Sequence, residues 1–487
     1  MLDRIGQRLP QPLTLFLASL AAVSVSLAFR KGLQDPDYFW HLQTGELIAR
    51  SGLPSNDPFS FTYGGPWTLH EWLAQLVIYR LVDGIGPVAT LGIFALLPPA
   101  ALGVLAIALQ RERVPIRAVV AATLICATVL IPYVTVRPQL FSWLLLAVVL
   151  AILMRVRPSS ARTLVALPPI FVLWANLHGL YVIGLGVVAV YVLLTMLGGA
   201  APMAARKAPV AIVGVVSLLA SSLTPAGPAG LLYPLRYVDS GDWGLANIPE
   251  WQSPNFHDLV QIPLLIMILG VAIVGQRGPL WIRIVAYLAI IGALLANRNA
   301  PVAAVVCLPA LAIGLAPWLP SRQTAPDSPG SRRVLEALVA ALVIIGAFGA
   351  IPAAPGFGGV LLGRYPAAGV ERLRQLQPAS RIVAEYGWGG YVIRSMYADG
   401  TRVFVDGRND MYPEGILRDY SAIRAGDPGS EGILDRYAVD AMLFPPEAPI
   451  VKGIAQAAGW CEAYRDPRQV LLLRSCAGPT AGSSPSG

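Results

Sequence analysis

The chain has 487 residues, of which 55% are hydrophobic and only 13% are charged. Because soluble domains carry about 25% charged residues, this composition excludes a soluble protein. The 47 glycines and 42 prolines are too many for a coiled coil, and the long apolar runs between them exclude disorder and collagen. The net charge of +8 comes from basic residues that lie between apolar runs, so we interpret them as topology signals and expect no nucleic-acid partner.

Apolar runs of membrane-spanning length fill the first three quarters of the chain. A span needs about 20 apolar residues, and we count about eleven such runs before residue 355. The first, about Pro12–Phe29, is interpreted as a retained span because it lacks a small-residue cleavage site. The runs centre near residues 20, 98, 125, 147, 170, 189, 216, 267, 289, 309 and 344.

Charged residues are distributed unequally between the two sides that these runs define. Basic clusters at 111–117, 155–162 and 322–333 fall on one side, which the positive-inside rule assigns to the cytoplasm. Acidic residues gather in the long loops 30–87 and 224–258 on the opposite side. An odd number of spans then predicts a multi-pass protein with a cytoplasmic N-terminus and an extracytoplasmic C-terminal region.

The predicted organisation follows from the apolar runs and the long segments between them. Residues 1–354 form a transmembrane domain that includes the extracytoplasmic loops 30–87 and 224–258. Residues 355–477 mix short β-like runs with helical stretches and form a small extracytoplasmic α/β domain, and the Gly/Ser/Pro-rich residues 478–487 form a disordered tail. The fold class is therefore an all-α polytopic membrane protein with a small C-terminal α/β domain.

Shorter elements are predicted within the first loop and the C-terminal domain. A surface helix covers 38–50 and ends at Gly52, and a second covers 70–82. Helical stretches are expected near 416–424 and 450–458. The predicted strands are 381–384, 391–394, 402–405, 441–444 and 470–473.

The four cysteines divide into two pairs. Cys126 and Cys307 lie within predicted spans, where packing residues are expected. Cys461 and Cys476 lie in the extracytoplasmic domain, where oxidation is permitted. The spacing leaves open whether these two are bonded.

The most informative stretch is Asp35-Pro-Asp37-Tyr-Phe-Trp-His41, directly after the first span. Two carboxylates two positions apart near a helix start can share a divalent cation such as Mg²⁺ or Mn²⁺, or divide base and orienting roles. The alternative is that one of them only caps the helix. Because aromatic, acidic and histidine residues gather in the same loop, we also predict a substrate-binding group, which consists of His41, His70, Glu71 and Trp72.

This order of features resembles the GT-C superfamily of integral-membrane glycosyltransferases. The strings Asp35-Pro-Asp-Tyr-Phe-Trp-His-Leu, Asp57-Pro-Phe-Ser-Phe-Thr and His70-Glu-Trp-Leu resemble a bacterial branch of that superfamily. The architecture is similar over most of the chain, whereas the motifs cover only about residues 35–73 and Val405–Tyr412.

The resemblance implies a sugar donor carried on polyprenyl phosphate, membrane lipids as partners and a location in the bacterial inner (plasma) membrane. It also implies that Asp35 or Asp37 is a general base or a metal ligand. The chain departs from the protein-mannosyl and aminoarabinose branches, whose Lys-Pro-Pro-like segment would fall near His70-Glu71-Trp72. The donor sugar and any metal requirement therefore stay open.

A lipid phosphate leaving group needs cations at the membrane face, because its charge is unfavourable at a low-dielectric boundary unless it is paired. Arg137 and Arg298 each lie at the predicted outer end of a span, where basic residues are scarce. We predict that they bind the donor phosphate, the alternative being that each anchors its span by snorkelling. In the C-terminal domain, Asp406 and Arg408 follow a predicted strand and are candidates for binding the acceptor sugar, or they form an ion pair within a turn.

The predicted function is inverting glycosyl transfer from a polyprenyl-phosphate donor to a glycan, lipid or protein acceptor on the extracytoplasmic face. Two alternatives remain at this point, a lipid-linked glycan polymerase or ligase and a metal-dependent hydrolase or phosphotransferase that uses His41, His70, Glu71 and Asp37. A transporter or channel is disfavoured, because ionisable residues are almost lacking in the middle of the predicted spans.

Overall fold

The computed structural model describes residues 11–156, 162–198, 207–233, 247–320, 363–377, 379–408, 410–454 and 459–474. Contacts along the chain divide it into two compact units. The helical unit comprises Met1–Leu33, Leu69–Leu235 and Leu245–Leu361, whereas the α/β unit joins Gln34–Thr68 to Leu362–Gly487.

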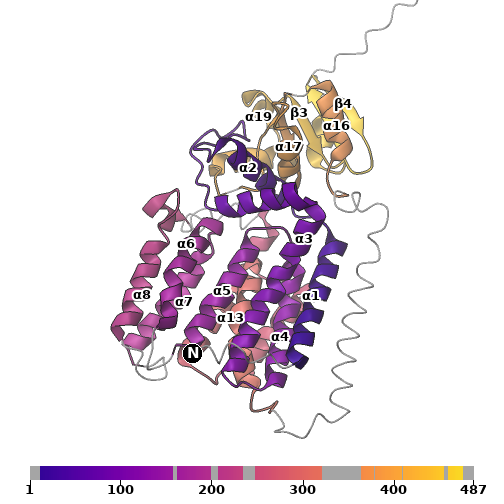
Figure 1. Cartoon of the computed structure of the whole chain (residues 1–487). Coiled ribbons are helices and arrows are strands. Elements are labelled where there is room, and N and C mark those ends of the chain that lie inside the picture. Colours follow the sequence, from indigo (N-terminus) through magenta and orange to yellow (C-terminus); the bar gives the residue numbers. More distant parts are fainter. Residues whose placement is uncertain are drawn as a thin grey trace, which may run out of the picture. The chain divides into compact units, whose positions relative to one another are not determined.

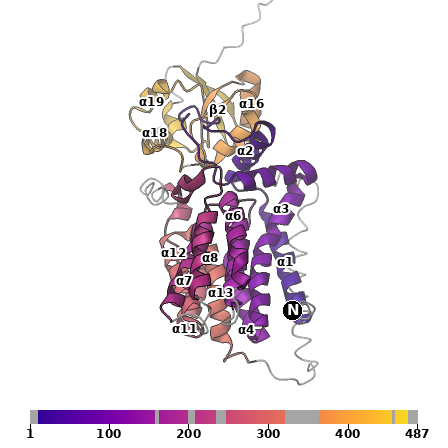
Figure 2. The ribbon, with the colours of Figure 1, turned by 60° about the vertical axis from the view of Figure 1, so that its left-hand side comes forward.

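The helical unit is a bundle of apolar helices that run side by side (Figure 1 and, from another side, Figure 2). In the described part of the chain, four helical segments are long and apolar enough to cross a membrane, and six apolar helices are shorter. They coincide with ten of the predicted runs, and the run near residue 344 lies outside the described residues, so the count of eleven spans stays a prediction. The helices are α1 (Gln11–Lys31), α3 (Trp72–Arg111), α4 (Ile116–Leu130), α5 (Gln139–Met154), α6 (Leu167–Leu177), α7 (Tyr181–Met196), α8 (Lys207–Ala220), α11 (Ile262–Val274), α12 (Leu280–Leu295) and α13 (Ala300–Leu315).

Helix α13 is the centre of this bundle. Every residue from Ala300 to Ala312 is buried, and the helix packs against α3, α4, α5, α11 and α12. A helix that is apolar on all sides is expected to be enclosed by others, and its alanines allow the neighbouring backbones to approach closely. Outer helices instead expose large aliphatic side chains, such as Ile212 and Ile273, as expected for a surface that faces lipid.

Helix α3 consists of two parts. At Gly86 the backbone turns to φ 83° and ψ 164°, and Pro87 follows. Glycine tolerates this positive φ, and proline cannot donate the hydrogen bond that would continue the helix. The part before Gly86 therefore confirms the second predicted short helix, and the part after it coincides with the apolar run predicted near residue 98.

The α/β unit contains a five-stranded sheet in the order β2-β1-β3-β5-β4. Strands β2, β1 and β3 run parallel to one another, and β5 runs antiparallel to both of its neighbours, β3 and β4. This confirms a small C-terminal sheet. The predicted strand at 391–394 is wrong, because these residues lie in helix α17, and β4 was not predicted. The strands are β1 (Arg381–Ala384), β2 (Arg402–Val403), β3 (Ala441–Phe444), β4 (Trp460–Arg465) and β5 (Val470–Arg474), and the helices are α16 (Ala367–Leu376), α17 (Gly389–Met396), α18 (Glu414–Ala425), α19 (Ser430–Arg436) and α20 (Pro449–Ile454).

The segment Gln34–Thr68 extends this sheet. Its helix α2 (Asp37–Ser51) ends at Gly52, whose φ of 83° suits glycine, as predicted. Beyond it, Val403 N–H donates to Phe59 O (3.0 Å) and Phe61 N–H donates to Val403 O (3.1 Å). The contacts thus place this segment with the α/β unit, whereas the sequence-based boundaries assigned it to residues 1–354. The predicted boundary at 354/355 and the tail 478–487 lie outside the described residues.

Candidate active site

Three short turns at one end of the helical unit bring the two predicted phosphate-binding arginines together. Arg137 follows the turn η2 (Ile131–Tyr133), which lies between α4 and α5, and Arg298 lies in η8 (Asn297–Asn299), between α12 and α13. Both face Glu250 in η6 (Pro249–Trp251): Arg137 Nη1 is 3.3 Å from Glu250 Oε2, and Arg298 Nη1 is 4.0 Å from Glu250 Oε1. We call Arg137, Arg298 and Glu250 the arginine site.

Neighbouring contacts hold the arginine site in shape. Tyr133 Oη–H donates to Asn297 Oδ1 (2.8 Å), and Asn297 N–H donates to Gln252 O (2.9 Å). The Arg298 guanidinium lies 5.0 Å from the ring centre of Trp251, a cation–π contact. The side chains of Arg137 and Arg298 are 15% and 33% exposed, so neither is fully buried. The sequence predicted both arginines singly, but it did not predict Glu250 or Trp251.

A second polar group lies where α3 begins and α6 ends. Trp174 Nε1–H donates to Ser142 Oγ (2.7 Å), and that hydroxyl lies 2.9 Å from His178 Nδ1. Because Leu180 N–H also donates to Nδ1 (3.2 Å), this nitrogen accepts and Nε2 carries the hydrogen. His178 Nε2 then faces Glu71 Oε1 at 3.2 Å. The chain of donors thus orients the Glu71 carboxylate, and Ser142 and Trp174 are members that the sequence did not suggest.

The predicted substrate-binding residues His70 and Trp72 flank this carboxylate. His70 Nε2 lies 3.6 Å from Glu71 Oε1, and the His70 ring lies against Tyr233 with 4.6 Å between ring centres. Trp72 Nε1–H donates to Asn176 Oδ1 (2.7 Å). The structure therefore brings His70, Glu71 and Trp72 together in the helical unit, and their binding role stays a prediction.

The acidic pair lies at the start of α2 in the α/β unit. Asp35 Oδ1 accepts the Asp37 N–H (3.0 Å), which is the capping geometry that the sequence offered as an alternative. Asp37 Oδ1 accepts the indole N–H of Trp40 (3.0 Å). The two carboxylates thus differ, because one stabilises the helix start and the other is oriented by a side chain. His41 is buried, and its ring centre lies 3.7 Å from that of Trp40.

Glycines of the α/β unit allow close packing against this helix start. A Cβ at Gly390, near the start of α17, would lie 2.6 Å from Pro36 O, and a Cβ at Gly407 would overlap Asp37 Oδ1. Glycine at both positions therefore lets the backbone approach α2. In the Gly387–Gly390 run, Gly390 has this packing role, and a Cβ at Gly389 would instead lie 2.7 Å from Val405 O.

Gly390→Ala should destabilise the α/β unit by about 1–3 kcal/mol, because the added methyl group overpacks a backbone contact. Thermal unfolding of the purified chain measures this. Gly432→Ala is the matched control, since nothing lies within 4 Å of its added Cβ and alanine favours the helix. Equal melting temperatures for the two variants would contradict the packing role.

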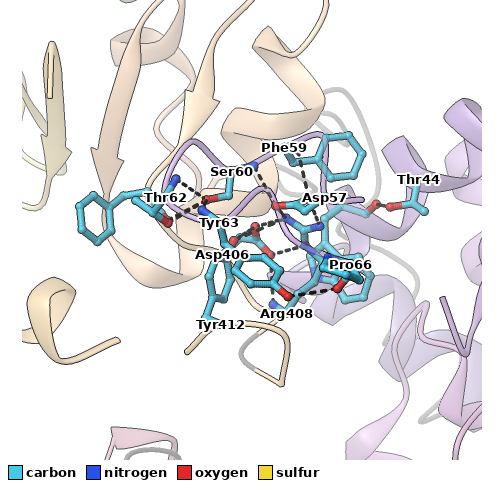
Figure 3. Close-up of polar contacts among 12 residues, drawn as sticks. Thr44, Asp57, Phe59, Ser60, Thr62, Tyr63, Pro66, Asp406, Arg408 and Tyr412 are labelled. Atoms are coloured by element: carbon cyan, nitrogen blue, oxygen red, sulfur yellow. Dashed lines mark hydrogen bonds and ion pairs between the residues drawn. The ribbon is translucent and has the colours of Figure 1, made fainter. Parts of the chain in front are cut away.

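Asp406 and Arg408 form a buried charge cluster with Asp57 from the first loop (Figure 3). Arg408 Nη1 is 2.6 Å from Asp57 Oδ1, and Arg408 Nη2 is 2.6 Å from Asp406 Oδ2. Tyr412 Oη–H donates to Asp406 Oδ2 (2.7 Å). Arg408 is 2% exposed and lies over the rings of Phe59 and Trp67. This is the ion pair that the sequence offered as the alternative to sugar binding, and we do not assign acceptor binding to these residues.

Burial and charge determine the protonation of this cluster. Burial alone lowers the pKa of the Arg408 guanidinium, but the Asp406 and Asp57 carboxylates outweigh it and hold the pKa well above its usual value. Burial, together with Asp406, raises the pKa of Tyr412 well above its usual value. Arg408 therefore stays charged and Tyr412 stays neutral at physiological pH.

The residues present do not assemble a metal site in the described part of the chain. No group of three or more His, Cys, Asp or Glu residues there is placed to hold a metal ion. Among the described residues, Asp35 and Asp37 belong to no such group of three, so we derive no step through a metal. The predicted divalent cation stays a prediction.

The cysteines fall into two environments. Cys126 and Cys307 are free and buried in the helical unit. Cys461, in β4, is disulfide-bonded, and Cys476 lies outside the described residues.

Solved membrane-enzyme structures resemble the chain over nearly its whole length. Its TM-score is 0.53 to ArnT from Cupriavidus metallidurans bound to undecaprenyl phosphate, with 16% identity over 96% of this chain and 99% of that one. The apo state of the same ArnT gives 0.55, with 15% identity over 95% and 97% of the two chains. The mycobacterial arabinofuranosyltransferase AftD gives 0.52, with 16% identity over 94% of this chain but 41% of its own.

Sequence comparison adds nothing to this, since no protein-family model and no curated protein matches the chain. At 15–16% identity, the structural similarity establishes the fold. The chain therefore has the same fold as ArnT and AftD, and its Asp35–His41 and His70–Trp72 strings resemble the GT-C superfamily of integral-membrane glycosyltransferases.

Proposed function

We propose that the protein is a membrane glycosyltransferase that moves a sugar from a polyprenyl-phosphate donor to an acceptor on the extracytoplasmic face of the membrane. The observation that carries this proposal is the arginine site, in which two cations from separate turns converge at one end of an apolar bundle. A phosphate attached to a lipid tail matches this combination of charge and apolar surroundings. The ArnT structure with undecaprenyl phosphate, which has the same fold, supports this donor class.

Two chemical requirements of glycosyl transfer have candidates in the chain. A base must take the proton of the acceptor hydroxyl, and cations must stabilise the charge that develops on the departing phosphate. Asp37, oriented by Trp40, is the proposed base, and Asp35 supports it by capping the helix start. Arg137 and Arg298 are the proposed phosphate-binding residues. Direct attack by the acceptor on the sugar carbon, in one displacement, would invert its configuration.

Arg298→Ala should weaken binding of undecaprenyl phosphate by about tenfold or more, because removing one charge-assisted partner costs about 1.5–3 kcal/mol. Titration of the purified protein in nanodiscs measures the dissociation constant. Arg111→Ala is the control, because Arg111 is exposed at the far end of α3. Equal affinities of the two variants would assign Arg298 a purely structural role and remove the main support for the proposal.

A further inference from the structure

Glu250 adds a negatively charged carboxylate to the two arginines of the arginine site. Its two carboxylate oxygens face different partners, Oε2 towards Arg137 and Oε1 towards Arg298. Two guanidinium groups and one carboxylate therefore lie side by side in the arginine site. The Glu250 side chain is 39% exposed, more than that of either arginine, so its carboxylate remains accessible.

The charge of the lipid phosphate changes during the proposed reaction. The donor is a phosphodiester with one negative charge. When the acceptor oxygen bonds to the sugar carbon, the bond from that carbon to the phosphate oxygen breaks, its electron pair stays on the phosphate, and the acceptor proton passes to the base. The product is a phosphomonoester, whose second pKa is about 6, so it carries close to two negative charges at pH 7.

We infer that Glu250 is a specificity residue that lets the arginine site hold the singly charged phosphodiester donor and disfavours the doubly charged phosphomonoester product. The two guanidinium groups can pair with the single negative charge of the donor. The additional negative charge of the product meets the Glu250 carboxylate, and like charges this close repel each other. Glu250 therefore promotes release of the spent lipid carrier. This inference rests on the proposed function. It assigns product release to Glu250, whereas the arginines stabilise the charge of the departing phosphate.

The test compares two lipid probes on wild-type protein and on Glu250→Gln. The probes are undecaprenyl phosphate, a monoester, and its methyl ester, a diester, each titrated into purified full-length protein in nanodiscs at pH 7.5. Glutamine keeps the shape of the side chain and removes its charge. The variant should bind the monoester about fivefold more tightly and the diester only about twofold more tightly, because the Glu250 charge acts on two negative charges in the first probe and on one in the second.

Glu112→Gln is the matched control. Glu112 lies before α4 and the arginine site lies after it, so a helix of about 22 Å separates them. This variant should leave both affinities unchanged.

The outcomes separate this inference from the proposed function. If Glu250→Gln changes both affinities by the same factor, or weakens them, charge discrimination by Glu250 is wrong while the lipid-phosphate site stands. If Glu112→Gln changes the two affinities as much as Glu250→Gln does, the effect comes from the net charge of the whole protein, and the inference again fails. If wild-type protein binds neither probe, the proposed function itself fails and this inference with it.

Discussion

Asp37→Asn should leave a folded protein that still binds the lipid phosphate but transfers sugar about 10²- to 10⁴-fold more slowly, the typical loss when a general base is removed. Asparagine keeps the shape of the side chain and can still accept the indole N–H of Trp40, so the start of α2 should persist. Its amide cannot take a proton from the acceptor hydroxyl. Transfer is measured with purified protein and a defined polyprenyl-phosphate sugar at saturating donor.

Asp35→Asn is the matched control for this experiment. Asp35 Oδ1 accepts the Asp37 N–H, and asparagine caps a helix start about as well as aspartate does. We therefore expect a loss of less than about tenfold for this variant, since it retains the base. Full activity of Asp37→Asn would overturn the proposed base, and the reverse order of the two losses would move that role to Asp35.

Arg408→Met should destabilise the α/β unit by about 3–5 kcal/mol, the usual cost of removing one partner from a buried ion pair. Methionine fills much of the space against Phe59 and Trp67 but leaves two buried carboxylates, Asp57 and Asp406, without their cation. Because Asp57 belongs to the first loop, this loop should become sensitive to proteases under conditions in which the wild type resists them. Limited proteolysis and thermal unfolding of the full chain measure the effect.

Two further variants separate the buried charges from general effects of losing an arginine. Arg418→Met removes an exposed ion pair with Glu414, whose contribution is at most about 1 kcal/mol. The triple variant Asp57→Asn, Asp406→Asn, Arg408→Met removes the unpaired carboxylates and should recover at least part of the loss. A melting temperature for Arg408→Met equal to that of Arg418→Met would show that the cluster does not stabilise the unit.

Local patterns in the sequence determined most of the elements. Ten apolar runs became helices, Gly52 ended α2, and β1 and β3 have the predicted bounds. These features depend on composition and on the conformational range of single residues, which a sequence displays directly. The residues at 391–394 misled the prediction because Val392 and Ile393 favour strands, yet they lie on the buried face of α17, where packing decides the structure.

Only the tertiary structure decided which distant residues meet. The sequence indicated Arg137 and Arg298 separately, but their convergence on Glu250 depends on three turns between different helices. Likewise, Asp57 and Arg408 are 351 positions apart, and their buried pair joins the first loop to the C-terminal sheet. Periodicity and motif spacing report on neighbours along the chain, whereas such pairings result from the packing of whole elements. The sequence alone therefore determined the apolar helices and the candidate residues, and the folded chain determined their partners.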